Sequence, residues 1–448
     1  MKDGSSKAMK TTIKTLCGML AMLAFTACSS NNDEAVNTPQ FWHVTLTASM
    51  GDETTRALSE GEGNIITASF AAGDVVKVLK SDGTELCELT AQSSGASTTL
   101  VGTISGTFSV NEELICRYRS ATANYDNQVG TLEGIGIATT CKDYAEGTLT
   151  VSATDPLTFT STNVTLSPKQ SITKFSFTDG TNPVSVKTFG IAAAGLVRSI
   201  AADATSTETV GAVTGTLATA SSDVYVALRN NTDAKQAYSF TIKDNDGNWY
   251  TGTKNAKLTN GKNYTATVTL TKLETLTGSS NAGDIGVIGG LPAIVVEINS
   301  VKKAVALMNA GALCPEAYGE YYTFDNRASG LSNGWYVPTQ AELYVKVNDE
   351  VTGGLAKISN SWTTQNGVNG RLFTIIEGKT LFLPAAGLDD GDNNPQDFLF
   401  VSTDGYYWSS TNYDDDEAYS LNFDSGVCQI IGWYKVDRLT VRPFHDLP

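Results

Sequence analysis

The stretch from Asp389 to Tyr434 has the residue types of a binding surface. It contains no Lys or Arg, and carboxylates are interleaved with aromatic rings. Carboxylates and amides can hold sugar hydroxyls directly or through calcium, and a Tyr or Trp ring can stack on the C–H face of a sugar. A solvated acidic loop is the competing interpretation. The candidate ligand or calcium residues are Asp390, Asp392, Asn394, Asp397, Tyr413, Asp414, Asp415, Asp416 and Trp433.

The segment Asp390 to Asn394 places oxygen-bearing side chains at alternate positions, as calcium loops do. Pro395 and the lack of a bidentate Glu break the standard loop pattern. The sequence therefore predicts no cofactor, with calcium as the one alternative left open.

Other catalytic chemistry has little support. His43 and His445 are the only histidines, which removes most histidine-based acid–base catalysis and metal ligation. Seven cysteines are present, and five remain beyond Cys17 and Cys28, so at least one of them is unpaired within the chain. None forms a Cys-x-x-Cys pair or has zinc-site spacing. The sequence therefore predicts a protein that is not an enzyme.

The N-terminus has the pattern of a signal peptide, which we assign to residues 1–28. Four lysines precede an apolar run from Leu16 to Phe25. That run is shorter than the roughly 20 residues that a spanning helix needs. Small residues lead into Cys28, and a polar tether over residues 29–40 follows.

The sequence Phe25-Thr26-Ala27-Cys28 resembles the lipobox of bacterial lipoproteins, although the usual first residue is Leu. The resemblance implies that Cys28 is acylated and that the chain is exported as an outer-membrane lipoprotein on the cell surface. An ordinary signal peptide with a cysteine at its cleavage site is the alternative.

Composition excludes one class of partner and favours one fold class. A net charge of −16 argues against nucleic-acid binding, which needs a basic face. Residues 41–49 alternate with period two, and Asp82-Gly83 separates two strand-like runs. Asn260-Gly261 precedes another alternating run, and residues 273–285 have the composition of a linker. The fold class predicted is mainly β.

Two segments beyond the linker have helical features. Thr339 to Glu342 forms a capping box after Pro338 and predicts a helix to about Asp349. Residues 301–310 have helical spacing as well, but a strand is the alternative there, so that segment stays ambiguous.

Several short motifs occur in a recognisable order, and residues 41–272 resemble the fimbrillin-like (Mfa-type) pilus proteins of Gram-negative anaerobes. The resemblance implies two tandem β-sandwich-like domains, at 41–160 and 161–272. It also implies cleavage between Arg56 and Ala57, loss of the first strand, and donor-strand exchange with other fimbrillin subunits. A solvated loop arginine is the alternative for Arg56. The motifs are Thr54-Thr55-Arg56-Ala57, Ala72-Gly73-Asp74-Val75-Val76, Leu166-Ser167-Pro168, Lys174-Phe175-Ser176-Phe177 and Gly261-Lys262-Asn263-Tyr264.

Residues 286–448 resemble FISUMP-type domains, which are related to the C-type-lectin-like fold of sulfatase-modifying factors. The resemblance implies an α+β lectin-like domain. Formylglycine-generating relatives use reactive cysteines, whereas Cys314 and Cys428 are expected to form a disulfide or to be two buried thiols. The motifs begin at Cys314-Pro315-Glu316-Ala317-Tyr318, Gly334-Trp335-Tyr336-Val337-Pro338, Leu383-Pro384-Ala385-Ala386-Gly387, Tyr407-Trp408-Ser409-Ser410-Thr411, Ala418-Tyr419-Ser420-Leu421 and Arg438-Leu439-Thr440-Val441-Arg442.

Together these features predict a surface adhesin at the tip of a fimbrillin-type pilus. Its C-terminal domain is expected to bind a glycan or a protein on another surface. A folded C-terminal domain fits a terminal subunit better than a stalk subunit, which donates its last strand. A glycan-binding lipoprotein that never polymerises is the alternative, and a formylglycine-type enzyme is a third, weaker one.

Overall fold

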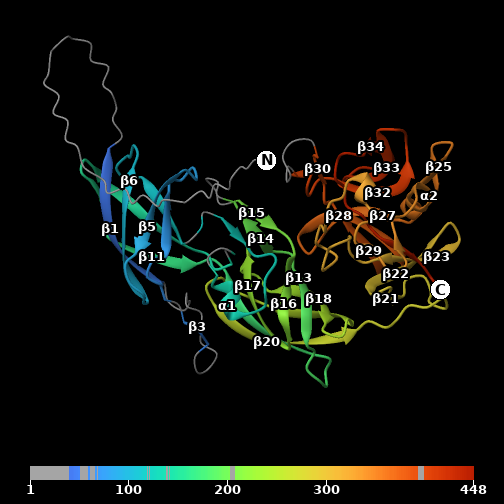
Figure 1. Ribbon diagram of the computed structural model, residues 1–448, viewed down its shortest axis with the longest axis horizontal. Helices are drawn as coiled ribbons and strands as arrows, with labels where there is room; N and C mark the ends of the chain where they lie inside the picture. The colour runs from blue at the N-terminus through green and yellow to red at the C-terminus, as the bar shows by residue number, and fades with distance from the viewer. Residues whose placement is uncertain are drawn as a thin grey trace, which may run out of the picture. The chain divides into compact units, whose positions relative to one another are not determined.

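A computed structural model describes residues 40–50, 59–60, 66–67, 69–118, 120, 122–137, 140, 142–201, 207–391 and 398–448. Strands dominate these residues, and the two α-helices are four residues long each, α1 (Leu132–Ile135) and α2 (Gln340–Leu343). The mainly-β prediction is confirmed (Figure 1). A small two-stranded sheet pairs β2 (Ser59–Glu60) with β3 (Ile66–Thr67). No described helix is long and apolar enough to span a membrane.

The first large sheet closes on itself. Its order is β10-β9-β11-β1-β6-β5-β4-β7, and β7 also pairs with β9. Alternate side chains of its strands fill one core, which includes Leu46, Val78 and Leu100. The strands are β1 (Phe41–Met50), β4 (Val75–Leu79), β5 (Glu85–Ala91), β6 (Ser97–Ser105), β7 (Glu113–Tyr118), β9 (Ala145–Thr154), β10 (Leu157–Phe159) and β11 (Asn163–Pro168).

The second large sheet runs in the order β15-β14-β17-β12-β20-β19-β18-β13-β16, with β8 paired to β14. Phe175, Phe177 and Phe240 meet edge to face or tilted in its core. The strands are β8 (Ala123–Asn124), β12 (Ser171–Thr178), β13 (Val186–Ala192), β14 (Leu196–Ile200), β15 (Glu208–Val210), β16 (Val213–Ser221), β17 (Asp223–Asn230), β18 (Gln236–Asp244), β19 (Trp249–Ala256) and β20 (Asn263–Lys272).

The sequence places the boundary between the first two domains at residue 160, but each of the two large sheets includes a segment from the other side of that boundary. Strand β11 follows that boundary, yet it pairs with β1 and β9 of the first sheet. Conversely, Ala123, Tyr125 and Ile135 precede it and lie in the second core. The hydrogen-bond ladders, and not the order along the chain, therefore decide which core each segment joins.

The remaining residues form several short sheets. A five-stranded sheet has the order β21-β22-β23-β35-β24, and two three-stranded sheets, β27-β28-β29 and β32-β33-β34, accompany it. Two strand pairs complete the set, β25-β26 and β30-β31. The elements are β21 (Ile285–Ile288), β22 (Leu291–Ile298), β23 (Val301–Ala306), η2 (Phe324–Asn326), β24 (Trp335–Tyr336), β25 (Val345–Val347), β26 (Glu350–Gly353), η3 (Leu355–Lys357), β27 (Asn360–Gln365), β28 (Val368–Ile376), β29 (Lys379–Pro384), β30 (Leu388–Asp389), β31 (Phe398–Leu399), β32 (Gly405–Asn412), β33 (Glu417–Phe423), β34 (Cys428–Tyr434) and β35 (Phe444–Asp446).

Local expectations in this region are partly confirmed. The capping box of Thr339 and Glu342 is present, but the helix ends at Leu343, so its expected extension to about Asp349 is wrong. Tyr344 is extended, and residues 345–347 instead pair with 350–353. The ambiguous segment after Val301 is the strand β23. Leu276 of the expected linker is buried against Ala293 and Val295, so this stretch packs on the C-terminal domain.

Candidate functional site

Strand β1 occupies an internal position of the first sheet. Residues Phe41 to Ser49 pair antiparallel with β6, and Thr47 to Met50 pair parallel with β11. Every second side chain, namely Val44, Leu46 and Ala48, is buried in the core. Main-chain hydrogen bonds on both edges do not depend on side-chain identity, so another strand with the same alternation could replace β1.

One residue of β1 is imperfectly accommodated. The Trp42 ring meets Phe108 edge to face at 5.5 Å between centroids. Its indole N–H is buried and has no hydrogen-bond partner in the described part of the chain. An unsatisfied buried donor costs roughly 1–3 kcal/mol, which weakens the hold of the sheet on this strand.

The expected processing residues Cys28, Arg56 and Ala57 lie outside the described residues. The last residue of β1 is Met50, so Arg56 follows a strand whose position is well defined. Cleavage at Arg56 would leave β1 attached to the rest of the chain only through hydrogen bonds and packing.

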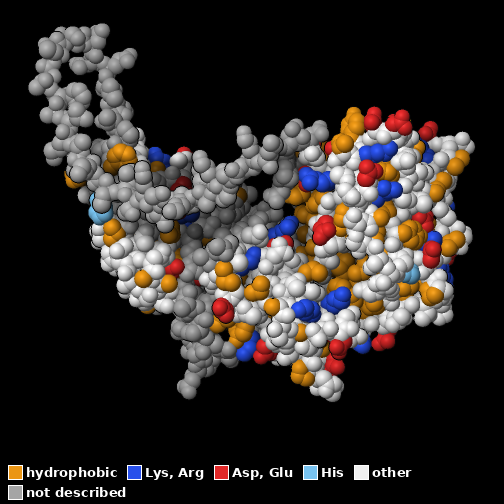
Figure 2. All heavy atoms as spheres, in the orientation of Figure 1, with side chains coloured by type: hydrophobic (Ala, Val, Ile, Leu, Met, Phe, Trp, Pro, Cys, Tyr) orange, Lys and Arg blue, Asp and Glu red, His pale blue; other side chains and the backbone are white. Residues whose placement is uncertain are grey.

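The acidic turn between β32 and β33 is held by its own backbone. The Asp414 carboxylate accepts hydrogen bonds from the amides of Asp416 (2.9 Å) and Glu417 (2.8 Å). Lys435 donates to the carbonyls of Asp414 and Asp415 at 2.6 and 2.9 Å. Asp415 and Asp416 are exposed. In the part of the molecule that holds β33 and β34 (Figure 1), Figure 2 shows carboxylates beside hydrophobic side chains.

The two aromatic candidates differ in how free they are. Tyr413 is 55% exposed and meets Tyr419 edge to face at 5.1 Å. Trp433 is half-buried: its indole N–H donates to Asp437 at 2.8 Å, and its ring packs on Tyr406 at 4.8 Å. Tyr413 can therefore stack on a ligand, whereas Trp433 mainly supports the fold.

The calcium-like segment is only partly visible. Asp392, Asn394 and Asp397 lie outside the described residues, and Asp390 is half-buried. The neighbouring Asp389 is buried and forms an ion pair with Arg438 at 3.1 Å. Within the described part of the chain, no group of three or more His, Cys, Asp or Glu side chains is arranged to hold a metal.

The four cysteines that the structure describes are thiols. Cys87, Cys116, Cys314 and Cys428 are free, so of the two outcomes left open for Cys314 and Cys428 the structure has the thiol pair. Burial raises the pKa of Cys428 to about 11 and holds the pKa of Cys314 well above its usual value. Both are therefore protonated at neutral pH and are poor nucleophiles.

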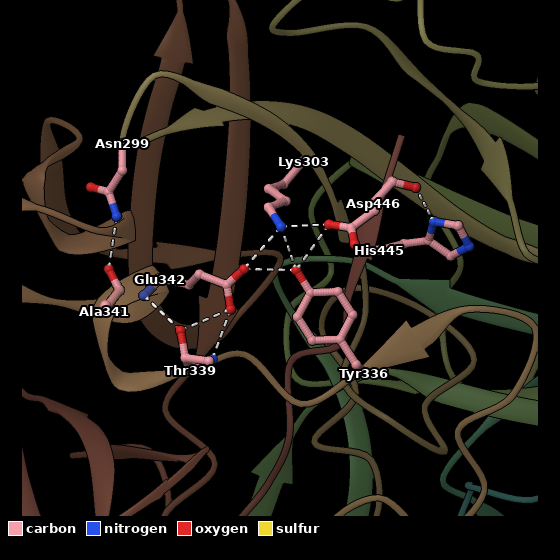
Figure 3. A network of polar contacts seen from close by, with 8 residues as sticks. All are labelled: Asn299, Lys303, Tyr336, Thr339, Ala341, Glu342, His445 and Asp446. Atoms are coloured by element: carbon pink, nitrogen blue, oxygen red, sulfur yellow. Dashed lines mark hydrogen bonds and ion pairs between the residues drawn. The ribbon is translucent and has the colours of Figure 1, made fainter. Parts of the chain in front are cut away.

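Sequence reasoning missed a charged network in the five-stranded sheet (Figure 3). Lys303 of β23 contacts Asp446, lies 3.1 Å from Glu342, and donates to the Tyr336 hydroxyl at 3.0 Å. Burial would lower the pKa of Lys303, but the hydrogen bonds to Asp446, Tyr336 and Glu342 outweigh it and raise that pKa. The lysine is therefore a fixed cation that ties α2 to β35, and only the capping box gave a signal for part of this network.

Comparison with known proteins finds one family profile and several solved structures. A family profile described as a domain of unknown function (DUF8237) matches residues 344–444, and no curated protein matches the chain. Among solved structures, a candidate cell adhesion protein from Bacteroides uniformis is 15% identical, with a TM-score of 0.31 over 51% of this chain and 96% of that one. The tip fimbrial protein Mfa3 from Porphyromonas gingivalis, truncated at its C-terminus, is 9% identical, with a TM-score of 0.27 over 52% and 98%.

A fimbrial assembly protein from Parabacteroides distasonis is 11% identical, with a TM-score of 0.28 over 58% of this chain and 96% of that one. All three TM-scores are below 0.5, so these similarities establish neither a shared fold nor a shared function.

Proposed function

We propose that this chain is an exported surface adhesin of the fimbrillin type, assembled with other subunits by strand exchange. The position of β1 carries the proposal. It lies between β11 and β6, contributes every second side chain to the core, and precedes Arg56. Cleavage after Arg56 followed by loss of β1 would open a groove with two unpaired edges, which is an aggregation hazard unless another strand fills it.

A terminal position in the pilus is also part of the proposal, and the fixed position of β35 supports it. β35 pairs with β23 on one side and with β24 on the other. The Lys303 network holds it further through Asp446 (Figure 3). A strand fixed in this way is not free to be donated to another subunit.

N-terminal sequencing of surface-extracted protein tests the assembly proposal. A mature chain that begins at Ala57 and co-purifies with pilus subunits is expected. A mature chain that begins at Cys28 and is monomeric would contradict strand exchange and favour the non-polymerising lipoprotein.

Anchoring through Cys28 is a separate part of the proposal. The lipobox-like sequence supports it, and Cys28→Ser should prevent acylation and release the protein from membranes. Unchanged membrane fractionation of this variant, with no labelled lipid on the natural protein, would contradict the anchor.

Ligand recognition by the C-terminal domain completes the proposal. Exposed Tyr413 beside Asp415 and Asp416 supports contact with a glycan or a protein surface, with calcium as an optional bridge. Deleting residues 286–448 should abolish adhesion while leaving export intact. Melting of the natural protein with calcium and with a chelator, repeated for Asp415→Ala with Asp416→Ala, separates a metal-dependent contact from a direct one.

A further inference from the structure

An open cavity of about 570 Å³ lies outside the acidic stretch, between the second β-sheet and the C-terminal domain. One wall is the outer face of β18, β19 and β20. Tyr238, Phe240 and Ile242 point into the core, so the intervening residues of β18 face outward. The register places Ser239 beside Thr253 and Thr241 beside Thr251, and Thr251 is also paired with Thr271. The wall is thus a patch of hydroxyls: Ser239, Thr241, Thr251, Thr253, Thr269 and Thr271.

These hydroxyls are largely unused by the protein. Ser239 accepts a weak hydrogen bond from Asn366 at 3.5 Å. The side chains of the five threonines form no hydrogen bond with the described residues. These hydroxyls on neighbouring strands are therefore available to donate to and accept from a ligand.

The opposite wall presents a carboxyl group fixed by two amides. Glu316 is 5% exposed, and its Oε1 accepts hydrogen bonds from Gln365 at 2.9 Å and Asn366 at 2.7 Å. Burial raises the pKa of Glu316 despite those two hydrogen bonds. The carbonyl oxygens of both amides face no protein donor among the described residues, so they remain available as acceptors.

Close backbone approaches fix the two walls relative to each other. Gly367, at φ +81° in the turn after β27, would bring a Cβ to 2.4 Å from Val210 and 2.5 Å from the Ala194 carbonyl. Gly190 of β13 lies so close to Cys314 that a Cβ atom added at position 190 would be 2.5 Å from the Cβ of Cys314. The cavity is therefore preorganised by glycine contacts that any larger residue would disrupt, which lowers the entropic cost of binding.

The chemistry of the lining selects a class of ligand. None of the residues that line the cavity is Lys or Arg, so nothing there favours an anion. The lining offers hydroxyls, amides and one carboxyl group, which can donate to and accept from many hydroxyls at once. The volume falls within the roughly 300–1,000 Å³ of small-ligand sites.

We propose that this cavity binds a neutral saccharide of one or two sugar units, held by the threonine hydroxyls on one wall and by Gln365, Asn366 and Glu316 on the other. The inference rests on the proposed adhesin function and names the site of its glycan. The site is separate from the acidic turn, which would then contact a protein surface, and the second β-domain and the C-terminal domain both contribute residues to it.

Ligand-observed saturation-transfer NMR on the full chain tests the proposal. The probes are maltose, cellobiose, lactose and N,N′-diacetylchitobiose at millimolar concentration. At least one should bind, and Thr251→Val with Thr269→Val should weaken it about tenfold, because each lost hydrogen bond changes affinity several-fold. Valine keeps the branched shape, so the strands should stay folded.

Matched controls separate the site from general effects. Thr265→Val changes an exposed threonine on the same strand outside the cavity and should leave affinity unchanged. Thr253→Trp should block the cavity without altering the core. Absence of binding by all four probes would overturn the proposal, and so would binding that survives both cavity variants or that is lost only in Asp415→Ala with Asp416→Ala.

Failure of this inference is distinguishable from failure of the proposed function. A chain that is cleaved at Arg56 and joins pili, yet binds none of the probes, would remove the cavity and keep strand exchange. Saccharide binding by a chain that is never cleaved would keep the cavity and remove strand exchange.

Discussion

The first β-domain and the C-terminal domain contain similar secondary structure but are held together differently. In the first, long strands form one closed sheet, and Arg117 is its buried guanidinium. Strand β1 itself is held by main-chain pairing and by apolar packing: Val44, Leu46 and Ala48 are buried, and Trp42 and Met50 pack against the core. In the second, short sheets are joined by specific side chains. Arg442 is fully buried and donates to the carbonyls of Ala306 (3.0 Å) and Phe382 (3.1 Å).

This difference decides which part can exchange a segment. A strand held by main-chain hydrogen bonds and simple alternation can be replaced by any strand with a similar pattern. A segment held by a buried guanidinium or an indole N–H needs those side chains in place, because an orphaned buried polar group is costly. In the proposed function, the first domain would exchange a strand and the C-terminal domain would supply a fixed surface.

Removing β1 should have the largest effect. A chain beginning at Ala57 lacks Val44 and Leu46, whose burial is worth about 1.5–3 kcal/mol each, and all the hydrogen bonds of the strand. We expect the first domain to lose its cooperative unfolding transition and the C-terminal domain to keep its own. Differential scanning calorimetry with hydrogen exchange measures both.

A peptide of residues 40–50 supplied in trans should restore the lost transition, and the same peptide with Leu46→Asp should not. An unchanged transition in the truncated chain would mean that β1 is dispensable and that the two domains do not differ in this respect.

Truncating Trp408 should have a smaller effect, confined to the other domain. Trp408 is fully buried, meets Phe324 edge to face at 5.5 Å, and donates to the Tyr322 carbonyl at 2.7 Å. Trp408→Ala should destabilise the C-terminal domain by about 3–5 kcal/mol. Trp408→Phe keeps a ring and should cost less. Hydrogen exchange should show the first domain unaffected, and loss of protection in β6 would contradict the independence of the two.

The sequence predicts the first domain better than the C-terminal one for the same physical reason. Alternation in residues 41–49 predicts Trp42, Val44, Leu46 and Ala48 on one face. The last three are buried, and Trp42 is half-buried. The Asp82-Gly83 turn between β4 and β5 is present, with Gly83 at φ 84°. Period-two patterns and turn residues are local signals, and they carry most of the information for long strands.

Features that depend on tertiary contacts had no local signal. The segment around Tyr125 joins the second core across the predicted boundary, and Leu276 of the expected linker is buried. The hydroxyl patch depends on the register of three strands, which no local sequence pattern specifies. In the sequence, Glu316 is one polar residue in an aromatic motif, and only the fold places Gln365 and Asn366 within hydrogen-bond distance of it. Arg56 and Cys28 were found from the sequence alone, and their roles stay predictions.

Removing a helix cap should have a modest effect that differs between domains. Thr339 caps α2, and its backbone amide also donates to the Glu342 carboxylate at 2.8 Å, whereas Thr131 caps α1 without a reciprocal partner. Thr339→Ala should destabilise the C-terminal domain by about 1 kcal/mol, and Thr131→Ala should destabilise the second domain by less. Chemical denaturation measures both, Thr339→Ser is the conservative control, and equal losses would show that the capping box adds nothing here.

The smallest effects should be opposite responses to pH. Burial would raise the pKa of Glu146, but the Tyr144 hydroxyl, Lys169 and Arg117 outweigh it and lower that pKa below its usual 4.5. Glu146 therefore contributes stability that is present above about pH 4.5 and is lost as the pH falls through its folded pKa. Glu316 has a raised pKa because of burial, so its contribution is complete below about pH 4.5 and is lost as the pH rises through its folded pKa.

Melting the natural chain and each Glu→Gln variant from pH 3 to pH 8 separates the two contributions. Gln does not titrate, whereas Glu146 of the natural chain becomes protonated at acid pH and loses its stabilising charge. The melting temperature of Glu146→Gln should therefore lie below that of the natural chain at neutral pH, and this difference should shrink toward acid pH. The melting temperature of Glu316→Gln should rise relative to that of the natural chain as the pH rises. Only the natural chain has a buried carboxyl group there, and ionising that group in the folded state is costly. Glu297→Gln alters an exposed carboxylate and should track the natural chain throughout. Parallel curves for Glu146→Gln and Glu316→Gln would show that the two buried carboxyls titrate alike, and would remove the electrostatic part of the contrast between the domains.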